Sequence, residues 1–252
     1  MAGVFERRPM ISVDAMGYGR SDDQRQSSIQ TGLINVLDQA AASAGLERDS
    51  WERQGVGDGE FSVLLPHTAE GRLVGDFPRY LTAHLNRLNG DVPWENRLRL
   101  RLAIHYGTAI ANVNGHSGQG PVEVARLCDS PPLRAALKES RADLAVMLSD
   151  RIFTDVVRHG HALSVAPEDF REVEVNVKEF RERAWLWIPR GRNVHSLELD
   201  LTPDEAPAPE KAEGEGSSSA KRNEPAPERS SSVHNEFHER VDATGANFGF
   251  RS

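Results

Sequence analysis

The chain has 252 residues, of which 38% are hydrophobic and 27% charged, and its formal net charge at pH 7 is −8. This length suits one α/β domain with an appended segment, and the acidic balance argues against a protein that coats nucleic acid. No apolar run approaches the roughly 20 residues that span a bilayer, and no secretory h-region precedes the first expected strand, so we expect a cytoplasmic protein that binds neither membrane nor nucleic acid.

Strand-like and helix-like apolar periods alternate along residues 1–200. In chain order, the pattern predicts a strand at 9–14, a helix ending at Gly45, strands at 51–56 and 60–65, a helix at 77–88, a strand at 97–106, a helix at 121–137, a strand at 144–148, a helix at 150–157 and a hairpin of strands at 170–177 and 184–188. The strands do not alternate regularly with helices as in a βαβ array. We therefore predict an α/β (α+β) fold with a mixed β-sheet and flanking helices.

Residues 97–106, RLRLRLAIHY, alternate arginine with apolar residues. Successive side chains on a strand point to opposite faces of the sheet, so this pattern predicts a half-buried strand with a basic outer face. The element order also leaves the strand at 9–14 and the hairpin at 51–65 free to lie side by side. Asp14 and Asp58 would then meet, although they are far apart in the chain.

Asp14 and Asp58 are the candidate metal-binding residues. Asp14 ends an apolar strand and precedes a turn that contains Gly17 and Gly19, and Asp58 lies at the tip of the glycine-rich hairpin. Two carboxylates can share a pair of divalent ions, while the backbone N–H groups of a glycine-rich turn face a triphosphate. Each aspartate also has a plainer interpretation, because aspartate is common as a helix cap and in Gly-Asp-Gly turns.

Four stretches in this order, ISVDAMGYG, VGDGEFSVLLP, LRLAIHYGTA and ARLCDSPPLRAAL, resemble the catalytic domain of class III nucleotidyl cyclases. The resemblance covers roughly residues 8–190 and implies the palm-like fold of that family. The hairpin alone is also similar to the GGDEF hairpin of diguanylate cyclases, but the phenylalanine-lysine segment that those enzymes have after their first aspartate is absent. The sequence His105-Tyr106-Gly107 also favours class III.

The resemblance implies a metal site and a triphosphate site in each subunit. Two divalent ions, Mg²⁺ or Mn²⁺, would be held by Asp14 and Asp58, with Ala15 at the same metal site. The implied triphosphate contacts are made by Gly17, Tyr18 and Gly19.

The family's head-to-tail homodimer completes each site with groups from the other subunit. Its transition-state arginine corresponds to Arg126, and Lys178 corresponds to a contact with the terminal phosphates.

Three positions depart from the family pattern. Val122 stands where the family has an asparagine, and Gln54 and Gln119 stand where it has the lysine and aspartate that read adenine.

A chain that keeps both metal-binding aspartates but has an altered base pocket resembles the pyrimidine-nucleotide cyclases of anti-phage defence. Those enzymes convert UTP or CTP into cyclic UMP or cyclic CMP, which acts on a separate effector. Glutamine can donate or accept a hydrogen bond, so two glutamines could read another base edge. Two alternatives stay open: an adenylyl or guanylyl cyclase with an unusual base pocket, and a catalytically inactive module that binds nucleotide or only dimerises.

The C-terminal part of the chain changes composition after Leu201. Residues 202–232 are rich in Pro, Glu, Ser and Ala and have few side chains to bury, so we expect a disordered linker. Residues 233–252 contain Phe237, Phe248 and Phe250 in a polar peptide. This peptide could dock a partner or be a plain disordered tail.

Overall fold

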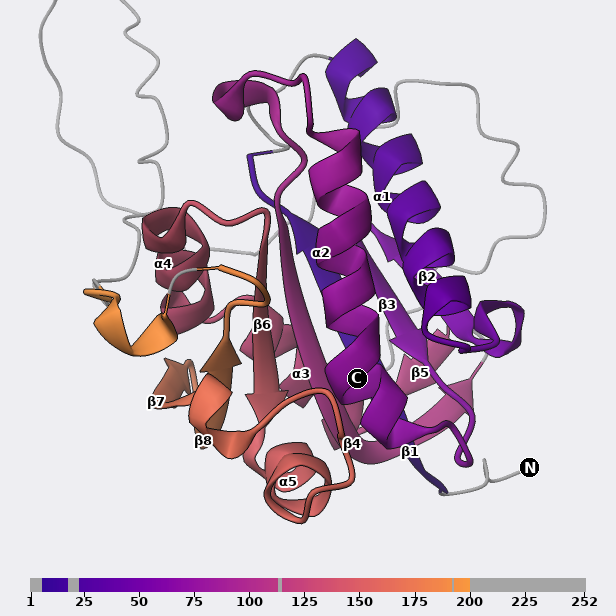
Figure 1. Ribbon diagram of the computed structural model, residues 1–252. Coiled ribbons are helices and arrows are strands. Elements are labelled where there is room, and N and C mark those ends of the chain that lie inside the picture. The colour runs from indigo at the N-terminus through magenta and orange to yellow at the C-terminus, as the bar shows by residue number, and fades with distance from the viewer. Residues whose placement is uncertain (1–5, 18–22, 113–114, 192, 200–252) are drawn as a thin grey trace, which may run out of the picture. The chain divides into compact units, whose positions relative to one another are not determined.

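A mixed β-sheet runs through the centre of the protein and has helices on both faces (Figure 1). The computed structural model describes residues 6–17, 23–112, 115–191 and 193–199, so the expected linker at 202–232 and the peptide at 233–252 lie outside the described residues. In chain order, the elements are β1 (Glu6–Ala15), α1 (Asp23–Ser43), β2 (Glu52–Val56), β3 (Gly59–Val63), α2 (Phe77–Leu88), β4 (Leu100–Asn112), β5 (Gly115–Ser117), α3 (Gln119–Cys128), α4 (Pro131–Ser140), β6 (Leu144–Ser149), α5 (Asp150–Ile152), β7 (Arg171–Val177) and β8 (Phe180–Trp187).

The strands follow the order β2-β3-β1-β4-β6-β8-β7, and the short β5 pairs with β4. β4 and β6 run parallel, while the other neighbouring strands are antiparallel. This mixed sheet with flanking helices confirms the predicted fold class. Because β1 lies between β3 and β4, its C-terminal end is next to both the β2–β3 hairpin and the start of β4.

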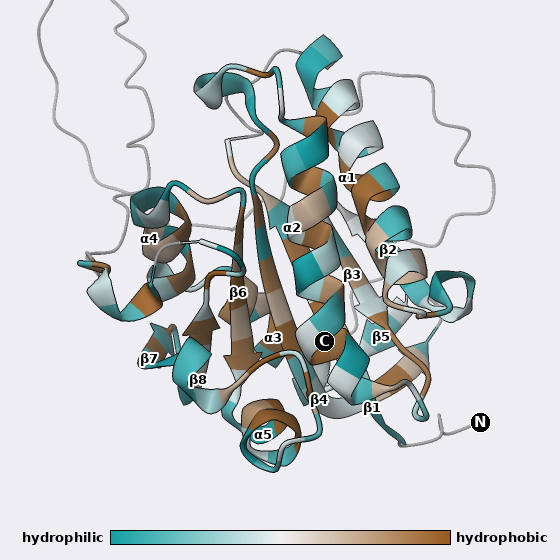
Figure 2. Cartoon of the chain, in the orientation of Figure 1, coloured by the Kyte–Doolittle hydropathy of each residue, from teal (hydrophilic) through white to brown (hydrophobic). Residues whose placement is uncertain are grey.

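Two apolar layers enclose the sheet. Ile11 and Val13 of β1 pack in the layer that includes Leu81 of α2, whereas Met10 packs in the opposite layer with Leu127 of α3. Figure 2 shows the hydrophobic residues concentrated on the strands and on the inner sides of the helices. A one-residue slip of β1 would exchange its two faces, so burial on both sides specifies the register on which the candidate site depends.

Several element boundaries differ from the expected ones. The helix expected at 121–137 is two helices, because Ser130 has an extended backbone and Pro131 begins α4. β4 starts later than expected and continues to Asn112, and β5 was not expected. The helix expected at 150–157 is the short α5 followed by a π-helix over Phe153–Arg158.

The prediction of a basic, solvated face on β4 is wrong. Arg99 is buried and donates to the carbonyl oxygens of Leu137 and Ala142, and the side chain of Arg101 is only 12% exposed. α3 and α4 cover this face of the sheet. The alternation within one strand cannot show which of its two faces a distant helix will cover.

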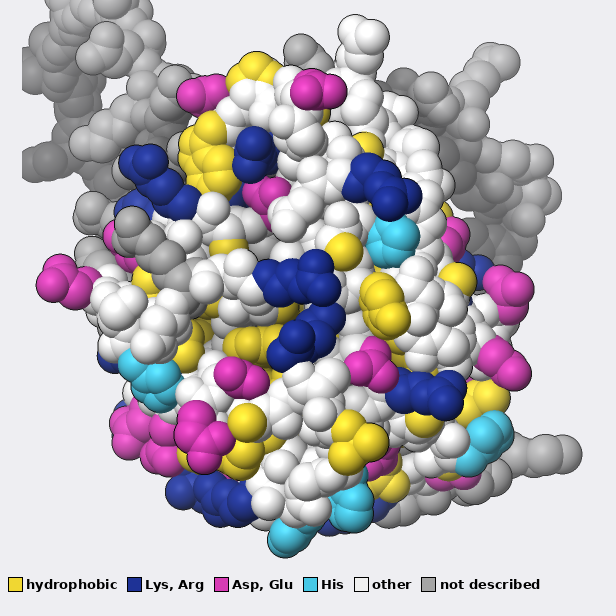
Figure 3. Space-filling model, in the orientation of Figure 1, with side chains coloured by type: hydrophobic (Ala, Val, Ile, Leu, Met, Phe, Trp, Pro, Cys, Tyr) yellow, Lys and Arg dark blue, Asp and Glu magenta, His cyan; other side chains and the backbone are white. Residues whose placement is uncertain are grey.

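No helix in the described part of the chain is both long and apolar enough to cross a membrane. On the face formed by α1 and α2, basic and acidic side chains are interspersed, with single apolar side chains between them (Figure 3). Such a mixed surface is ordinary for the outer side of a helical layer.

Candidate active site

Asp14 and Asp58 meet at one end of the sheet. Asp14 is the penultimate residue of β1, and Asp58 lies in the turn between β2 and β3. The antiparallel register sets Asp14 opposite Gly59, and the N–H of Ala15 donates to the carbonyl oxygen of Asp58 at 3.2 Å. The carboxylates affect each other, since burial and then the charge of Asp14 raise the pKa of Asp58.

Glycines allow the hairpin tip to fit against β1. Gly57 has a φ of 59°, in the left-handed region that glycine adopts without steric cost. A Cβ atom on Gly59 would overlap the carbonyl oxygen of Val13. The Gly-Asp-Gly sequence is therefore required by the turn and by its close approach to β1, and this approach is what carries Asp58 to Asp14.

A buried ion pair supports the hairpin. Arg48 donates to both carboxylate oxygens of Glu60 at 2.8 Å and also to Asp38, and the Ser62 hydroxyl donates to Glu60 at 2.6 Å. The side chains of Arg48 and Glu60 are 5% and 10% exposed. Removing either partner would leave a charge in a dry environment, so this pair fixes the strand that follows Asp58.

Arg101 is a residue of this site that sequence reasoning did not single out. It lies opposite Asp14 in the β1–β4 register, and its guanidinium forms an ion pair with the Asp14 carboxylate. Its second contact, at 3.5 Å, is with Asp129 at the end of α3. In the sequence, Arg101 is one of several alternating arginines, and only the pairing of β1 with β4 distinguishes it from the others.

The donor set fits a hard divalent cation. No group of three or more His, Cys, Asp or Glu side chains suited to a metal occurs among the described residues, and the side-chain oxygen donors available here are two carboxylates. Mg²⁺ and Mn²⁺ prefer oxygen ligands, and Mg²⁺ is typically bound by one or two carboxylates together with substrate phosphates. A cation between Asp14 and Asp58 would also offset the repulsion that raises the pKa of Asp58.

The turn after β1 is described only in part. Gly17 has a φ of 86°, which makes a tight reversal possible directly after Asp14 and Ala15. Tyr18 and Gly19, the other expected triphosphate contacts, lie outside the described residues.

The two glutamines expected to read the base lie in different surroundings. Gln54 is on β2, and its amide oxygen is 2.6 Å from the position that a Cβ atom on Gly115 of β5 would occupy. Gln119 is the first residue of α3 and lines a separate cavity beside Gly107 and Thr108. The structure thus brings Gln54 to Gly115 of β5.

Arg126 lies on α3, near the turn between β7 and β8 that holds Lys178. The Arg126 guanidinium is 3.4 Å from the carboxylate of Glu179 and its Cζ is 5.9 Å from the ring centroid of Phe180. Lys178 has a φ of 54° in the turn between β7 and β8. Val122, one helical turn before Arg126, is 43% exposed.

The β7–β8 turn, which holds Lys178, is far from the acids within one subunit. β7 is four strands away from β1 in the sheet order, which corresponds to roughly 19 Å at about 4.8 Å per strand. The offset along the strands adds to this distance, because Asp14 lies at the level of Arg101 whereas the β7–β8 turn lies beyond the end of β6.

Solved nucleotide cyclases share this fold. An adenylate/guanylate cyclase/hydrolase from Silicibacter pomeroyi matches 74% of this chain and 99% of its own with a TM-score of 0.55 at 19% identity. The guanylyl cyclase Cya2 matches 79% of this chain and 100% of its own with a TM-score of 0.52 at 13% identity. A bacterial light-regulated adenylyl cyclase matches 73% of this chain and 53% of its own with a TM-score of 0.50 at 13% identity.

At these identities the likeness establishes a common fold, and the assignment of an activity rests on the site itself. No family model matches the chain, and no curated protein matches it in sequence.

Proposed function

We propose that this chain is a metal-dependent nucleotidyl cyclase. The observation that carries the proposal is the meeting of the Asp14 and Asp58 carboxylates, beside Arg101, on the fold of solved nucleotide cyclases. The carboxylates supply oxygen ligands for divalent cations. Arg101 supplies a guanidinium that can hydrogen-bond to a triphosphate, because phosphate oxygens accept from its planar N–H groups.

The proposed reaction is an intramolecular displacement at phosphorus. The ribose 3′-oxygen of a nucleoside triphosphate bonds to the α-phosphorus, the bond to the α,β-bridging oxygen breaks, and pyrophosphate leaves with the electron pair while the hydroxyl proton passes to solvent. Mn²⁺ or Mg²⁺ held by Asp14, Asp58 and the backbone at Ala15 would lower the pKa of the attacking hydroxyl and offset the developing charge. The protein's own groups orient the triphosphate and exclude water, and the backbone of residues 17–19 is proposed to contact the phosphates.

The proposed active form is a head-to-tail homodimer. Lys178 is far from Asp14 in one subunit, so it can act on the same triphosphate only if a second subunit supplies it, and Arg126 lies beside Glu179 in the same part of the chain. Arg126 would then stabilise the transition state and Lys178 would contact the terminal phosphates. Val122 offers no hydrogen bond where an asparagine is expected, and the absence of one such donor typically lowers turnover about 10²–10³-fold.

Among substrates we favour a pyrimidine nucleoside triphosphate, UTP or CTP. The support is the chemistry of Gln54 and Gln119, which lack the charges of the lysine and aspartate that read adenine. A glutamine amide can both donate and accept, as the edges of uracil and cytosine require. The cyclic UMP or cyclic CMP product would act on a separate effector as a second messenger in anti-phage defence.

The proposal is tested by incubating the full chain with Mn²⁺ and each of ATP, GTP, CTP and UTP and identifying the products by mass spectrometry. We expect a cyclic pyrimidine monophosphate and pyrophosphate in equal amounts, and no product from the Asp14→Asn or Asp58→Asn variants. Asp91→Asn, which changes an exposed acid elsewhere, is the matched control and should retain activity.

The other outcomes decide between the alternatives. Cyclic AMP or cyclic GMP would replace the pyrimidine assignment with an adenylyl or guanylyl cyclase that has an altered base pocket. No product from any of the four nucleotides would reject the enzyme and favour the inactive binding module.

A complementation experiment tests the dimer. Asp58→Asn and Arg126→Ala damage different halves of the proposed composite site, so each variant alone should be inactive. Mixed subunits should regain roughly a quarter of the wild-type activity, because half of the dimers are then mixed and each has one intact site. No recovery in subunits shown to exchange would reject the shared site.

A further inference from the structure

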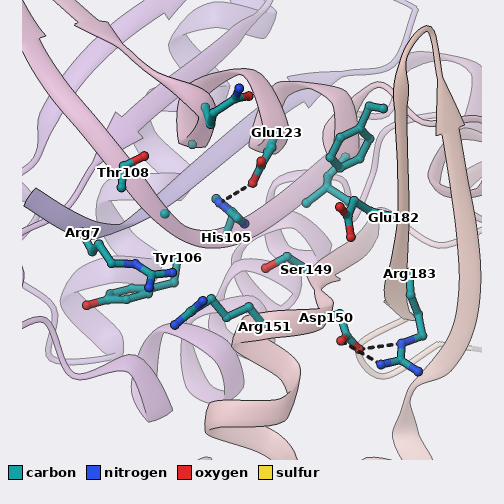
Figure 4. Close-up of a pocket in the computed structure, with 15 residues that line it drawn as sticks. Arg7, His105, Tyr106, Thr108, Glu123, Ser149, Asp150, Arg151, Glu182 and Arg183 are labelled. Atoms are coloured by element: carbon teal, nitrogen blue, oxygen red, sulfur yellow. Dashed lines mark hydrogen bonds and ion pairs between the residues drawn. The ribbon is translucent and has the colours of Figure 1, made fainter.

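A cavity that does not include the two candidate metal-binding aspartates lies beside α3. It encloses about 400 Å³ and is lined by residues from β1, β4, α3, the β6–α5 junction and β8. Its wall includes the cations Arg7, Arg151 and Arg183 and the buried side chains of His105 and Ser149 (Figure 4). Asp14, Asp58 and Arg101 do not line this cavity. The cavity is therefore distinct from the carboxylate pair, although Gln119, a proposed base-reading residue, lines it.

The Arg7 and Arg151 guanidinium groups, unlike that of Arg183, lack strong anionic partners in the described part of the chain. Arg7 lies over the ring of Tyr106, with 5.5 Å between Cζ and the ring centroid, and no carboxylate pairs with it there. Arg151 is 3.7 Å from Asp155 on the same helical turn, and both side chains are about half exposed. A pair of this kind is weak, because water screens exposed charges. Figure 4 shows both guanidinium groups on the same side of His105.

Two buried polar groups of the cavity wall are also without hydrogen-bond partners in the described structure. These groups are the His105 ring, at both Nδ1 and Nε2, and the hydroxyl of Ser149. The side chain of His105 is 8% exposed, and Ser149 is buried to the same degree. Buried polar groups in proteins almost always have hydrogen-bond partners, so two buried groups without partners beside one cavity point to a polar ligand.

The acidic residues of the cavity do not neutralise Arg7 and Arg151. Asp150 accepts two hydrogen bonds from Arg183 and one from Trp185, each at 2.9 Å. Glu123 lies 3.0 Å from Nε2 of His105, an electrostatic contact that is not aligned as a hydrogen bond. Figure 4 shows Glu123 and Glu182 on the side of His105 away from the two arginines. Arg7 and Arg151 therefore lie apart from Glu123 and Glu182, while Asp150 is already paired with Arg183.

We propose that this cavity is a binding site for a small oxyanion, a carboxylate or a phosphate, held between the Arg7 and Arg151 guanidinium groups and the Ser149 hydroxyl. Guanidinium groups match the geometry of carboxylate and phosphate oxygens, and a hydroxyl can donate one further hydrogen bond. The site shares α3 with Arg126, because Gln119 and Glu123 of that helix line the cavity. The proposal does not depend on the chain being a cyclase.

The test is isothermal titration calorimetry of the full chain with inorganic phosphate and, separately, with acetate, in metal-free and nucleotide-free buffer of constant ionic strength. We expect at least one of the two anions to bind with one site per chain. Arg7→Gln and Arg151→Gln should each weaken binding about tenfold, and Ser149→Ala several-fold, because each removes one charge-assisted or buried hydrogen bond. Arg181→Gln, an exposed arginine of β8 outside the cavity, should change the affinity less than twofold.

Three results would overturn the proposal. In the first, neither anion binds above the chloride control. In the second, Arg7→Gln and Arg151→Gln bind as tightly as Arg181→Gln while circular dichroism shows all three folded. In the third, phosphate binding is lost in Arg101→Gln but kept in Arg151→Gln, which would assign the anion to the candidate active site. A shift of the His105 ring resonances on titration with the bound anion is the expected second readout.

Discussion

Replacing Arg101 by glutamine should strengthen the binding of a divalent cation. The Arg101 guanidinium pairs with the Asp14 carboxylate, so it competes with any cation for the same oxygen atoms. Glutamine keeps a polar side chain of similar reach and removes the charge. The change therefore separates two opposing effects of Arg101, namely repulsion of the metal ion and attraction of the triphosphate.

The expected size follows from Coulomb's law. A unit positive charge about 5 Å from a divalent ion costs about 1.7 kcal/mol even at the dielectric constant of water, which is more than a tenfold change in affinity. The Arg101 side chain is only 12% exposed, so screening is weaker than in water and this figure is a lower bound. We therefore expect Mn²⁺ to bind at least about tenfold more tightly to Arg101→Gln.

Electron paramagnetic resonance of free Mn²⁺ measures this affinity without any turnover. The matched control is Arg53→Gln, which removes an exposed charge from β2 and should leave Mn²⁺ affinity unchanged. Unchanged or weaker Mn²⁺ binding in Arg101→Gln would refute the placement of the ion beside Asp14. The same variant should have a higher KM for the nucleotide, because the triphosphate loses a cationic partner.

Three further predictions concern the supports of the site. Glu60→Gln should lower the free energy of unfolding by about 3 kcal/mol, measured by urea denaturation, because it leaves Arg48 buried with only a half-exposed partner. Gly59→Ala should lower it by about 2 kcal/mol, because the new Cβ atom meets the backbone of β1, whereas Gly55→Ala has open space and should cost less than about 1 kcal/mol. Burial and two nearby arginines lower the pKa of His105 from 6.5 to about 4. Between pH 6.5 and pH 4, His105 is therefore protonated in the unfolded chain and neutral in the folded protein. Stability should therefore fall as the pH drops from 6.5 toward 4, and His105→Gln should remove about 2 kcal/mol of the loss between pH 7.5 and pH 5.

Each of these predictions has a result that contradicts it. The ion pair is not a support if Glu60→Gln unfolds at the same urea concentration as the wild type. Equal stability of Gly59→Ala and Gly55→Ala would mean that the hairpin does not approach β1 closely. An unchanged pH dependence in His105→Gln would assign the acid sensitivity to other groups.

The elements of the fold were predictable because their signals are local. The apolar residues of Phe77–Leu88 recur with the period of a helix, and α2 has those bounds. The turn at Gly57-Asp58-Gly59 follows from glycine's conformational freedom. The break between α3 and α4 was missed although Pro131 and Pro132 are visible in the sequence, because the apolar period continues across them.

The sequence by itself therefore determined the strands, most helices and the two candidate acids, Asp14 and Asp58, since periodicity and turn chemistry depend on neighbouring residues. Only the tertiary structure decided which groups surround those acids. The pairing of β1 with β4 sets Arg101 against Asp14, and α3 and α4 bury the face that the alternation of β4 had assigned to solvent. The distance of Lys178 from the acids and the cavity beside His105 also come from the order of strands in the sheet. These contacts join residues that are distant in the chain, and their free energy depends on burial and register, which no local pattern records.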